Sequence, residues 1–170
     1  MTHMVLRHRN GILPMGAVLL TLTWLGASCV NSSAPSAPTA SASVSEVLVD
    51  IGQQATTGAG NLVTVFSYES PVPSTRSAGA GMIFSAADVQ ACGGPHADPR
   101  TGVSRSQFAL ETPGPTGWAS VDPVKTPALQ NATLGPNKCE RGWITFRLPA
   151  NQKPQYLVLL SSNLVKWRIR

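Results

Sequence analysis

The sequence predicts an all-β fold, a two-sheet β-sandwich of about seven short strands. Several segments alternate apolar and polar residues with a period of two, the pattern of a strand that buries one face. Gly (15) and Pro (14) are frequent, whereas charged residues make up only 12% of the chain. This composition favours strands joined by turns. Neither a long helical periodicity nor an alternation of strands with helices is present, so a sandwich is favoured over an α/β fold.

The clearest predicted strand is the last one, where residues 165, 167 and 169 are apolar and residues 166, 168 and 170 are basic. Segment 62–68 is apolar or β-branched on both faces, as expected of a central strand. Another strand opens at 82–84 and runs towards Cys92, with a short helical turn over 85–90 as the alternative. The remaining strands are expected at 47–51, 108–110, 143–148 and 156–160, with Gly and Pro turn signals between them.

The first 28 residues have the composition of an export signal. Arg7 and Arg9 precede an apolar run at 15–25. This run is too short to span about 30 Å of hydrocarbon, but it has the length of the apolar part of a signal peptide. Three small residues, 26–28, then lead directly to Cys29.

Small residues that end in a Cys resemble the lipobox of bacterial lipoproteins. In that family the Cys sulfur receives a diacylglyceryl group, and cleavage makes this Cys the new N-terminus. The resemblance implies that Cys29 is lipid-modified, although Gly26 stands where Leu or Val is usual. The alternatives are an ordinary secretory signal with an incidental Cys29, and a permanent membrane helix, which the early end of the apolar run disfavours.

The predicted organisation has three parts. Residues 1–28 form the signal peptide, residues 29–43 the lipid-modified Cys and a flexible Ser/Ala/Pro-rich tether, and residues 44–170 the β-sandwich domain. This organisation predicts a domain anchored at the extracytoplasmic face of the cell membrane, with secretion as the alternative. Removal of Arg7 and Arg9 with the signal lowers the formal net charge from +5 to +3. The remaining basic residues are interspersed with acids, so a nucleic-acid partner is not expected.

The chain has three cysteines, Cys29, Cys92 and Cys139. An odd number in an exported protein requires a separate role for one of them, and lipidation of Cys29 supplies it. Export would place Cys92 and Cys139 in an oxidising compartment, where a disulfide between them is expected. Closing a loop of 47 positions would stabilise the domain by about 4 kcal/mol. Two free buried thiols are the alternative.

Catalytic chemistry has little support in the sequence. After the predicted signal there is one histidine, His96, with Asp98 close by and Asp88 upstream. A metal site or a Ser-His-Asp triad needs at least three converging groups, and here one imidazole lies in a Gly/Pro-rich turn. We therefore expect no catalytic residues, no metal site and no cofactor, and keep a hydrolase that uses His96 as an alternative.

Trp143 is the first candidate for a partner-binding surface. Simple alternation places it on the polar face with Arg141 and Arg147, and Trp and Arg are frequent at binding hot spots. The interpretation that we favour is that Gly142 marks a bulge, which would turn Trp143 into the core. Trp118, in a Gly/Pro-rich loop, is a second candidate, either as an exposed aromatic or as a plug over one end of the sandwich.

Four segments, 62–66, 81–92, 139–149 and 165–169, resemble a known exported family, most specifically through Gly-Trp-Ile-Thr-Phe-x-Leu-Pro at 142–149. This family comprises telokin-like, immunoglobulin-type domains of Gram-positive bacteria and actinobacteria, and is related to the mycobacterial immunoprotective extracellular antigen. The resemblance covers about residue 46 to the end and implies an immunoglobulin-like sandwich in an actinobacterial lipoprotein. The cysteine pair also resembles a bridge of actinobacterial members. The family has no shared catalytic residues, so it implies a fold and no activity.

These observations predict a membrane-anchored, extracytoplasmic lipoprotein whose sandwich is a non-catalytic binding or accessory module. Besides the membrane, which the lipid on Cys29 would reach, the expected partner is an unidentified envelope protein or a cell-wall component. The alternative is a structural or chaperone-like envelope component that has no specific ligand.

Overall fold

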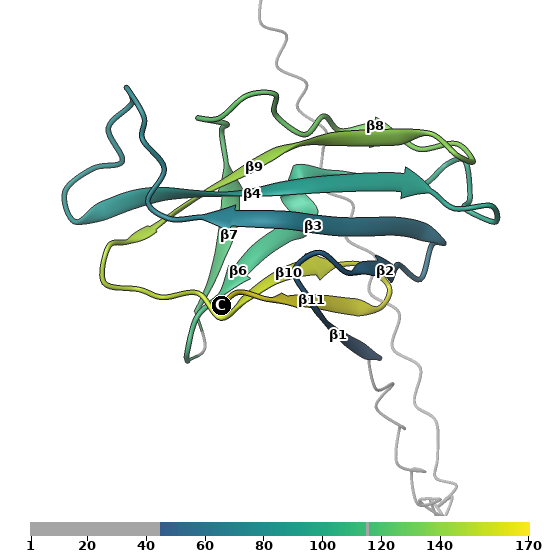
Figure 1. Cartoon of the computed structure of the whole chain (residues 1–170), viewed down its shortest axis with the longest axis horizontal. Helices are drawn as coiled ribbons and strands as arrows, with labels where there is room; N and C mark the ends of the chain where they lie inside the picture. The colour runs from purple at the N-terminus through teal and green to yellow at the C-terminus, as the bar shows by residue number, and fades with distance from the viewer. Residues whose placement is uncertain (1–44, 115) are drawn as a thin grey trace, which may run out of the picture. The chain divides into compact units, whose positions relative to one another are not determined.

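The alternating segments of the sequence form strands, as expected, in the computed structural model of the chain (Figure 1). The structure describes residues 45–114 and 116–170. The predicted signal peptide, Cys29 and the tether therefore lie outside the described residues. Within the described part of the chain, no helix is long and apolar enough to cross a membrane.

All seven predicted strands are present. In the part of the chain that the structure describes, the strands are β1 (Glu46–Asp50), β2 (Gln54–Thr56), β3 (Asn61–Glu69), β4 (Met82–Gly93), β5 (Gly102–Val103), β6 (Phe108–Glu111), β7 (Gly117–Val121), β8 (Ala132–Thr133), β9 (Cys139–Pro149), β10 (Tyr156–Leu160) and β11 (Leu164–Arg168), with one 3-10 helix, η1 (Arg105–Gln107). The alternative of a helical turn over 85–90 is wrong, because these residues continue β4.

The predicted number of about seven strands is also wrong. Among the described residues, nine strands form one hydrogen-bonded series in the order β1-β11-β10-β6-β7-β9-β4-β3-β2, and β5 and β8 pair separately. Three of the four unpredicted strands, β2, β5 and β8, contain only two or three residues, too few to show a period. The fourth, β7, begins at Gly117 in a segment rich in turn-forming residues.

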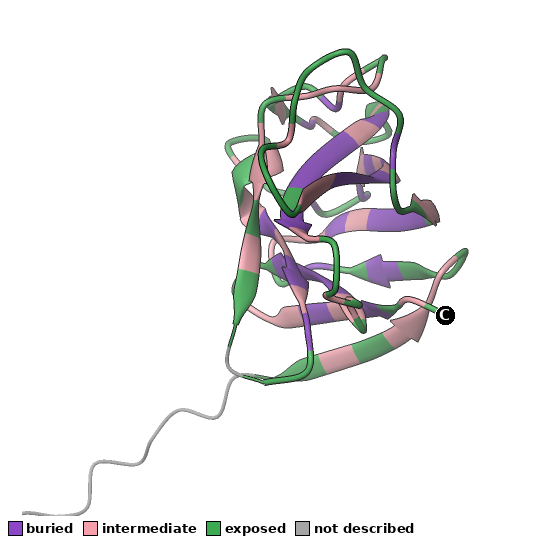
Figure 2. Cartoon of the chain, turned by 90° about the vertical axis from the view of Figure 1, so that its left-hand side faces the viewer, coloured by how far each residue is buried: buried purple, intermediate pink, exposed green. Residues whose placement is uncertain are grey.

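The series folds over into two layers because β7 belongs to both. Its first residues pair with β6, whereas Ser120 and Val121 pair with Phe146 and Thr145 of β9. One layer is built around β3, β4 and β9, and the other around β6, β10 and β11; Figure 2 shows buried residues between them. The chain enters in the second layer, where β1 runs parallel to β11, and crosses at 51–53 to pair β2 with β3.

The main core lies between the layers. It is formed by the apolar residues on the inward-facing side of the strands. Trp167 is its largest fully buried side chain, and its indole nitrogen donates a hydrogen bond to the Gln53 carbonyl oxygen at 3.1 Å. A buried Trp whose N–H has a partner combines a large apolar contact with a satisfied polar group. Other fully buried large side chains include Phe108, Phe146, Leu110, Leu129, Leu134, Ile144, Leu148, Leu157, Leu159, Val63 and Val65.

The predicted disulfide is present between Cys92 and Cys139. The two residues form the last pair in the register of β4 with β9, and their Cα atoms are 4.0 Å apart. The bridge therefore joins neighbouring strands of one layer. The residues between the two cysteines include β5, β6, β7 and β8, so the closed loop contains the chain's passage into the other layer and back.

Gly142 has a different role from the one predicted. The register of β4 with β9 runs without a shift past Gly142, so no bulge is present there. Instead, the segment 127–129 runs alongside β9 at this position, where Ala128 forms a parallel bridge with Trp143 through hydrogen bonds from Leu129 N to Trp143 O (3.1 Å) and from Trp143 N to Pro127 O (2.8 Å). A Cβ atom on Gly142 would lie 2.3 Å from the Leu129 nitrogen. Glycine is therefore required for the close approach of two backbones.

Candidate functional site

Three of the four predicted surface residues lie together on the outer side of the β3–β4–β9 layer. Arg141, Trp143 and Arg147 share this side of β9 because they alternate with the buried residues of the same strand. The expectation that Trp143 turns into the main core is wrong, since Gly142 produces no bulge. With Asp88 of β4 and Phe66 of β3, these three side chains define what we call the arginine–tryptophan face.

Arg141 is held in place by two partners. Its Nε and Nη2 atoms donate to the two carboxylate oxygens of Asp88 at 3.1 and 2.7 Å, a bidentate ion pair. Its guanidinium carbon lies 4.0 Å from the centroid of the Phe66 ring, a cation–π contact. Despite these two contacts, the Arg141 side chain remains 51% exposed. The Asp88 carboxylate raises the pKa of Arg141 further, so this exposed group stays cationic.

Phe66 comes to the surface through an irregularity in β3. The register of β3 with β4 shifts between Val65 and Ser67, and Phe66 is the extra residue. A β-bulge redirects the side chain of the inserted residue, and Phe66 is accordingly 39% exposed although it is a large apolar side chain. The apolar and β-branched residues of 62–68 give no sign of this shift, so sequence reasoning missed Phe66 as a surface residue.

A second cation covers Trp143. The Lys125 ammonium nitrogen lies 3.4 Å from the centroid of the Trp143 ring and also forms an ion pair with Glu69. Lys125 belongs to the segment after β7, and the Val124 nitrogen next to it donates to Thr145 Oγ1 at 3.1 Å. The segment is thus fastened to β9 beside the indole, and Lys125 is a further residue of the site that sequence reasoning missed.

Trp143 is half-buried because it belongs to a small second core outside the main one. The buried members of this cluster are Val72, Phe84 and Ala86, and Trp143 and Val124 pack against them. Phe84 also forms a cation–π contact, since the guanidinium carbon of Arg76 lies 5.8 Å from the Phe84 ring centroid. Packing therefore orders the outer side of the layer and leaves Trp143 half-buried.

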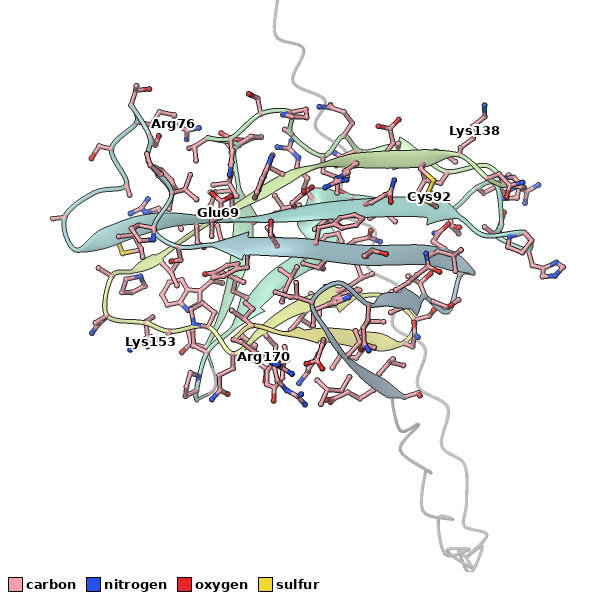
Figure 3. All side chains as sticks on the ribbon, viewed as in Figure 1. Glu69, Arg76, Cys92, Lys138, Lys153 and Arg170 are labelled. Atoms are coloured by element: carbon pink, nitrogen blue, oxygen red, sulfur yellow. A yellow bond between two sulfur atoms is a disulfide. The ribbon has the colours of Figure 1, made fainter. Side chains whose placement is uncertain are left out.

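Arg147 lies at the end of the arginine–tryptophan face nearer the start of β4. It is exposed, it is the register partner of Phe84, and it forms no ion pair with any described residue. Of the two arginines of the face, Arg147 therefore has the charge that the described residues compensate less. Figure 3 shows Glu69 and Arg76 towards this end of the layer, and Cys92 and Lys138 at the opposite end.

Trp118 does not join this face. It lies in β7, not in a loop, and is the register partner of Leu110, which is fully buried. Its side chain packs against the main core, and its indole nitrogen is buried without a hydrogen-bond partner among the described residues. The structure therefore separates Trp118 from Arg141, Trp143 and Arg147.

His96 is exposed in the loop after β4, and its side chain forms no hydrogen bond with the described residues. The carboxylates considered with it have other partners: Asp98 accepts from the Arg100 backbone nitrogen at 2.9 Å, and Asp88 binds Arg141. Over residues 45–114 and 116–170, no three His, Cys, Asp or Glu side chains come together in a way that could hold a metal ion.

Comparison with known proteins finds similar folds. The secreted protein MPT63 of Mycobacterium tuberculosis matches with a TM-score of 0.56 and 16% identity, over 75% of this chain and 100% of that one. A Bacillus subtilis protein named "putative lipoprotein (ycdA)" matches with a TM-score of 0.55 and 16% identity, over 68% of this chain. The chain spans only 38% of the length of this Bacillus protein. No protein-family model and no curated protein sequence matches the chain.

These likenesses confirm the all-β sandwich and the predicted resemblance to the fold of the mycobacterial antigen. At 16% identity they show the fold alone. Sandwich folds support many unrelated functions, so the fold alone assigns none to this chain.

Proposed function

We propose that the chain is an extracytoplasmic lipoprotein, anchored through a lipid on Cys29, whose domain is a non-catalytic module that binds a partner of the cell envelope. The domain would be of the immunoglobulin-like, telokin-like type. The proposal is supported by the sequence before Cys29, where basic residues, an apolar run and three small residues follow one another as in a signal peptide. It is also supported by the names of the two fold neighbours, "putative lipoprotein (ycdA)" for one and "secreted protein" for the other.

The observation that carries the proposal is the preorganised Arg141. This exposed cation is held by Asp88 and stacked on Phe66, so a partner would bind it with little loss of side-chain entropy. Arg and aromatic side chains in rigid settings are the usual hot spots of protein interfaces. Arg147, exposed beside them without an ion pair among the described residues, would add a charge that the partner can satisfy.

The hydrolase alternative needs a nucleophile and an orienting carboxylate beside His96. In the described part of the chain His96 is an exposed loop residue, and Asp88 and Asp98 are engaged elsewhere. This arrangement favours the binding module. A structural envelope role without a ligand would not require an exposed cation that is held in place, as Arg141 is.

The anchoring part of the proposal predicts the chemical form of the N-terminus. Mass spectrometry of the protein purified from membranes should show a chain that begins at Cys29 and carries a diacylglyceryl group. Cys29→Ala removes the acceptor sulfur, so the lipid mass should disappear and the protein should leave the lipid-anchored fraction. Ser28→Ala, which keeps a small residue before the cleavage point, is the matched control and should be processed normally. A membrane-derived chain that begins elsewhere and has no lipid would contradict the anchoring.

The binding part predicts a directional crosslink. We expect the full chain with a photo-crosslinking residue in place of Arg147 to form a discrete adduct in the cell envelope, whereas the same residue in place of Arg100, on the loop after β4, should not. Once the partner is isolated, Arg147→Glu should weaken its binding at least about tenfold, about 1.4 kcal/mol. Arg100→Glu makes the same charge change at another exposed site and should have no effect. Equal adducts from both positions would refute the proposed face.

A further inference from the structure

A cavity of about 430 Å³ opens at the end of the sandwich where β3 ends and β4 begins. Its walls come from both layers: Tyr68 and Ile83 belong to β3 and β4, and Ile169 follows β11. The connection from β9 to β10 forms another wall through Lys153 and its neighbours. In Figure 3, Lys153 lies at the opposite end of the domain from Cys92 and Lys138.

The cavity has the dimensions and lining of a small-molecule site. Pockets for small ligands measure about 300–1,000 Å³, and they combine apolar walls with a few polar groups. Here the apolar surface comes from Ile83, Ile169, Pro71 and Pro154. An aromatic or branched aliphatic group would bury its surface against these side chains.

One residue that lines the cavity has a buried hydroxyl without a partner. Tyr68 belongs to the lining, and its hydroxyl forms no hydrogen bond with the described residues. The Ser85 hydroxyl is also buried and unpaired, but Ser85 is not part of the lining. Burial raises the pKa of Tyr68, and the nearby Ser85 and Ser70 hydroxyls oppose this rise, although neither forms a hydrogen bond of regular geometry with it. Leaving a buried hydroxyl unpaired is unfavourable, and a polar atom of a ligand seated there would pair with it.

The mouth of the cavity is cationic. Among the described residues that line it, the charged ones are Lys153 and Arg170. Lys153 forms no ion pair within the described part of the chain, and Arg170 shares the Asp50 carboxylate with Arg168, at 3.3 and 3.1 Å. Two guanidinium groups on one carboxylate leave a net positive charge at this edge.

We propose that this cavity is a binding site for an amphipathic organic anion, whose apolar body lies against Ile83 and Ile169 and whose anionic group is held by Lys153 and Arg170. The Tyr68 hydroxyl pairs with a polar atom of the ligand. The site is distinct from the arginine–tryptophan face, so it stands or falls independently of the proposed partner binding.

The test uses the full chain and the amphipathic sulfonate 8-anilinonaphthalene-1-sulfonate as the probe. We expect saturable binding to one site, seen as a rise in probe fluorescence. The Lys153→Glu/Arg170→Glu double variant should weaken it at least tenfold, and Ile169→Trp, which fills the cavity, should abolish it. Lys138→Glu/Arg100→Glu makes the same change in net charge at exposed positions away from the cavity and should bind the probe like the parent chain.

A second control separates this cavity from another hollow. Leu160 lines a groove of about 440 Å³ on the outer side of β6 and β10, and Leu160→Ser should leave probe binding unchanged. Unchanged circular dichroism would show that each variant is folded. The proposal is overturned if the parent chain shows no saturable binding, if Leu160→Ser abolishes binding, or if both double variants weaken it equally.

Discussion

Replacing both cysteines, as Cys92→Ala/Cys139→Ala, should lower the free energy of unfolding by about 4 kcal/mol. The bridge closes a loop of 47 positions, and without it the unfolded chain recovers the conformational freedom of that loop. Domains of this size are stable by only about 5–15 kcal/mol, so the variant should unfold at a much lower urea concentration. Urea titration followed by near-ultraviolet circular dichroism measures the difference.

Reduction provides the control for this prediction. Cys139 is exposed and Cys92 is partly exposed, so a thiol reductant should reach the bridge in the folded protein. The parent chain in reductant should unfold like the double variant, whereas the double variant should be insensitive to reductant. If reduced and oxidised parent chains unfold at the same urea concentration, the bridge contributes nothing and the loop argument is wrong.

Gly142→Ala should destabilise the domain by about 3 kcal/mol, the upper end of the usual range for overpacking a core. The new Cβ would lie 2.3 Å from Leu129 N and 2.5 Å from Ala128 C, and both are backbone atoms that no side-chain rotation can move aside. The 127–129 segment would have to withdraw, which breaks its two hydrogen bonds to Trp143. We expect a large fall in the urea midpoint and a change in Trp143 fluorescence.

Gly117→Ala is the matched control, because Gly117 is also a strand glycine. Its new Cβ would meet only the Leu110 carbonyl oxygen, at 3.9 Å, so stability should change by less than about 1 kcal/mol in either direction. A Gly142→Ala protein as stable as Gly117→Ala would show that the 127–129 segment does not need its close approach to β9.

The strands that the sequence predicts well are those with one buried face. In β11, Val165 and Trp167 are fully buried and alternate with charged residues, so the local pattern carries the information. The strand β7 was missed because Trp118 follows Gly117 in a turn-rich segment, and only pairing with β6 and β9 makes it a strand. Tertiary contacts here override the local preference of the chain.

The candidate site shows the same division. Alternation correctly groups Arg141, Trp143 and Arg147 on one side of β9. The aromatic and cationic partners of Arg141 and Trp143 are Phe66, from a bulge, and Lys125, from a loop. Neither partner leaves a periodic signal in the sequence. The prediction for Gly142 failed for a related reason. It treated the glycine as a local irregularity of the strand, whereas Gly142 makes room for the backbone of another segment that packs against it in the folded domain.

The parallel pairing of β1 with β11 gives the domain a mechanical polarity. Five residue pairs, from Glu46 with Leu164 to Asp50 with Arg168, join the first strand to the last. A pull on the chain before Ser45, directed along β1, would load the hydrogen bonds of all these pairs together in shear and would not open them one after another. A domain held from its N-terminal side would therefore resist tension at the point where the load enters.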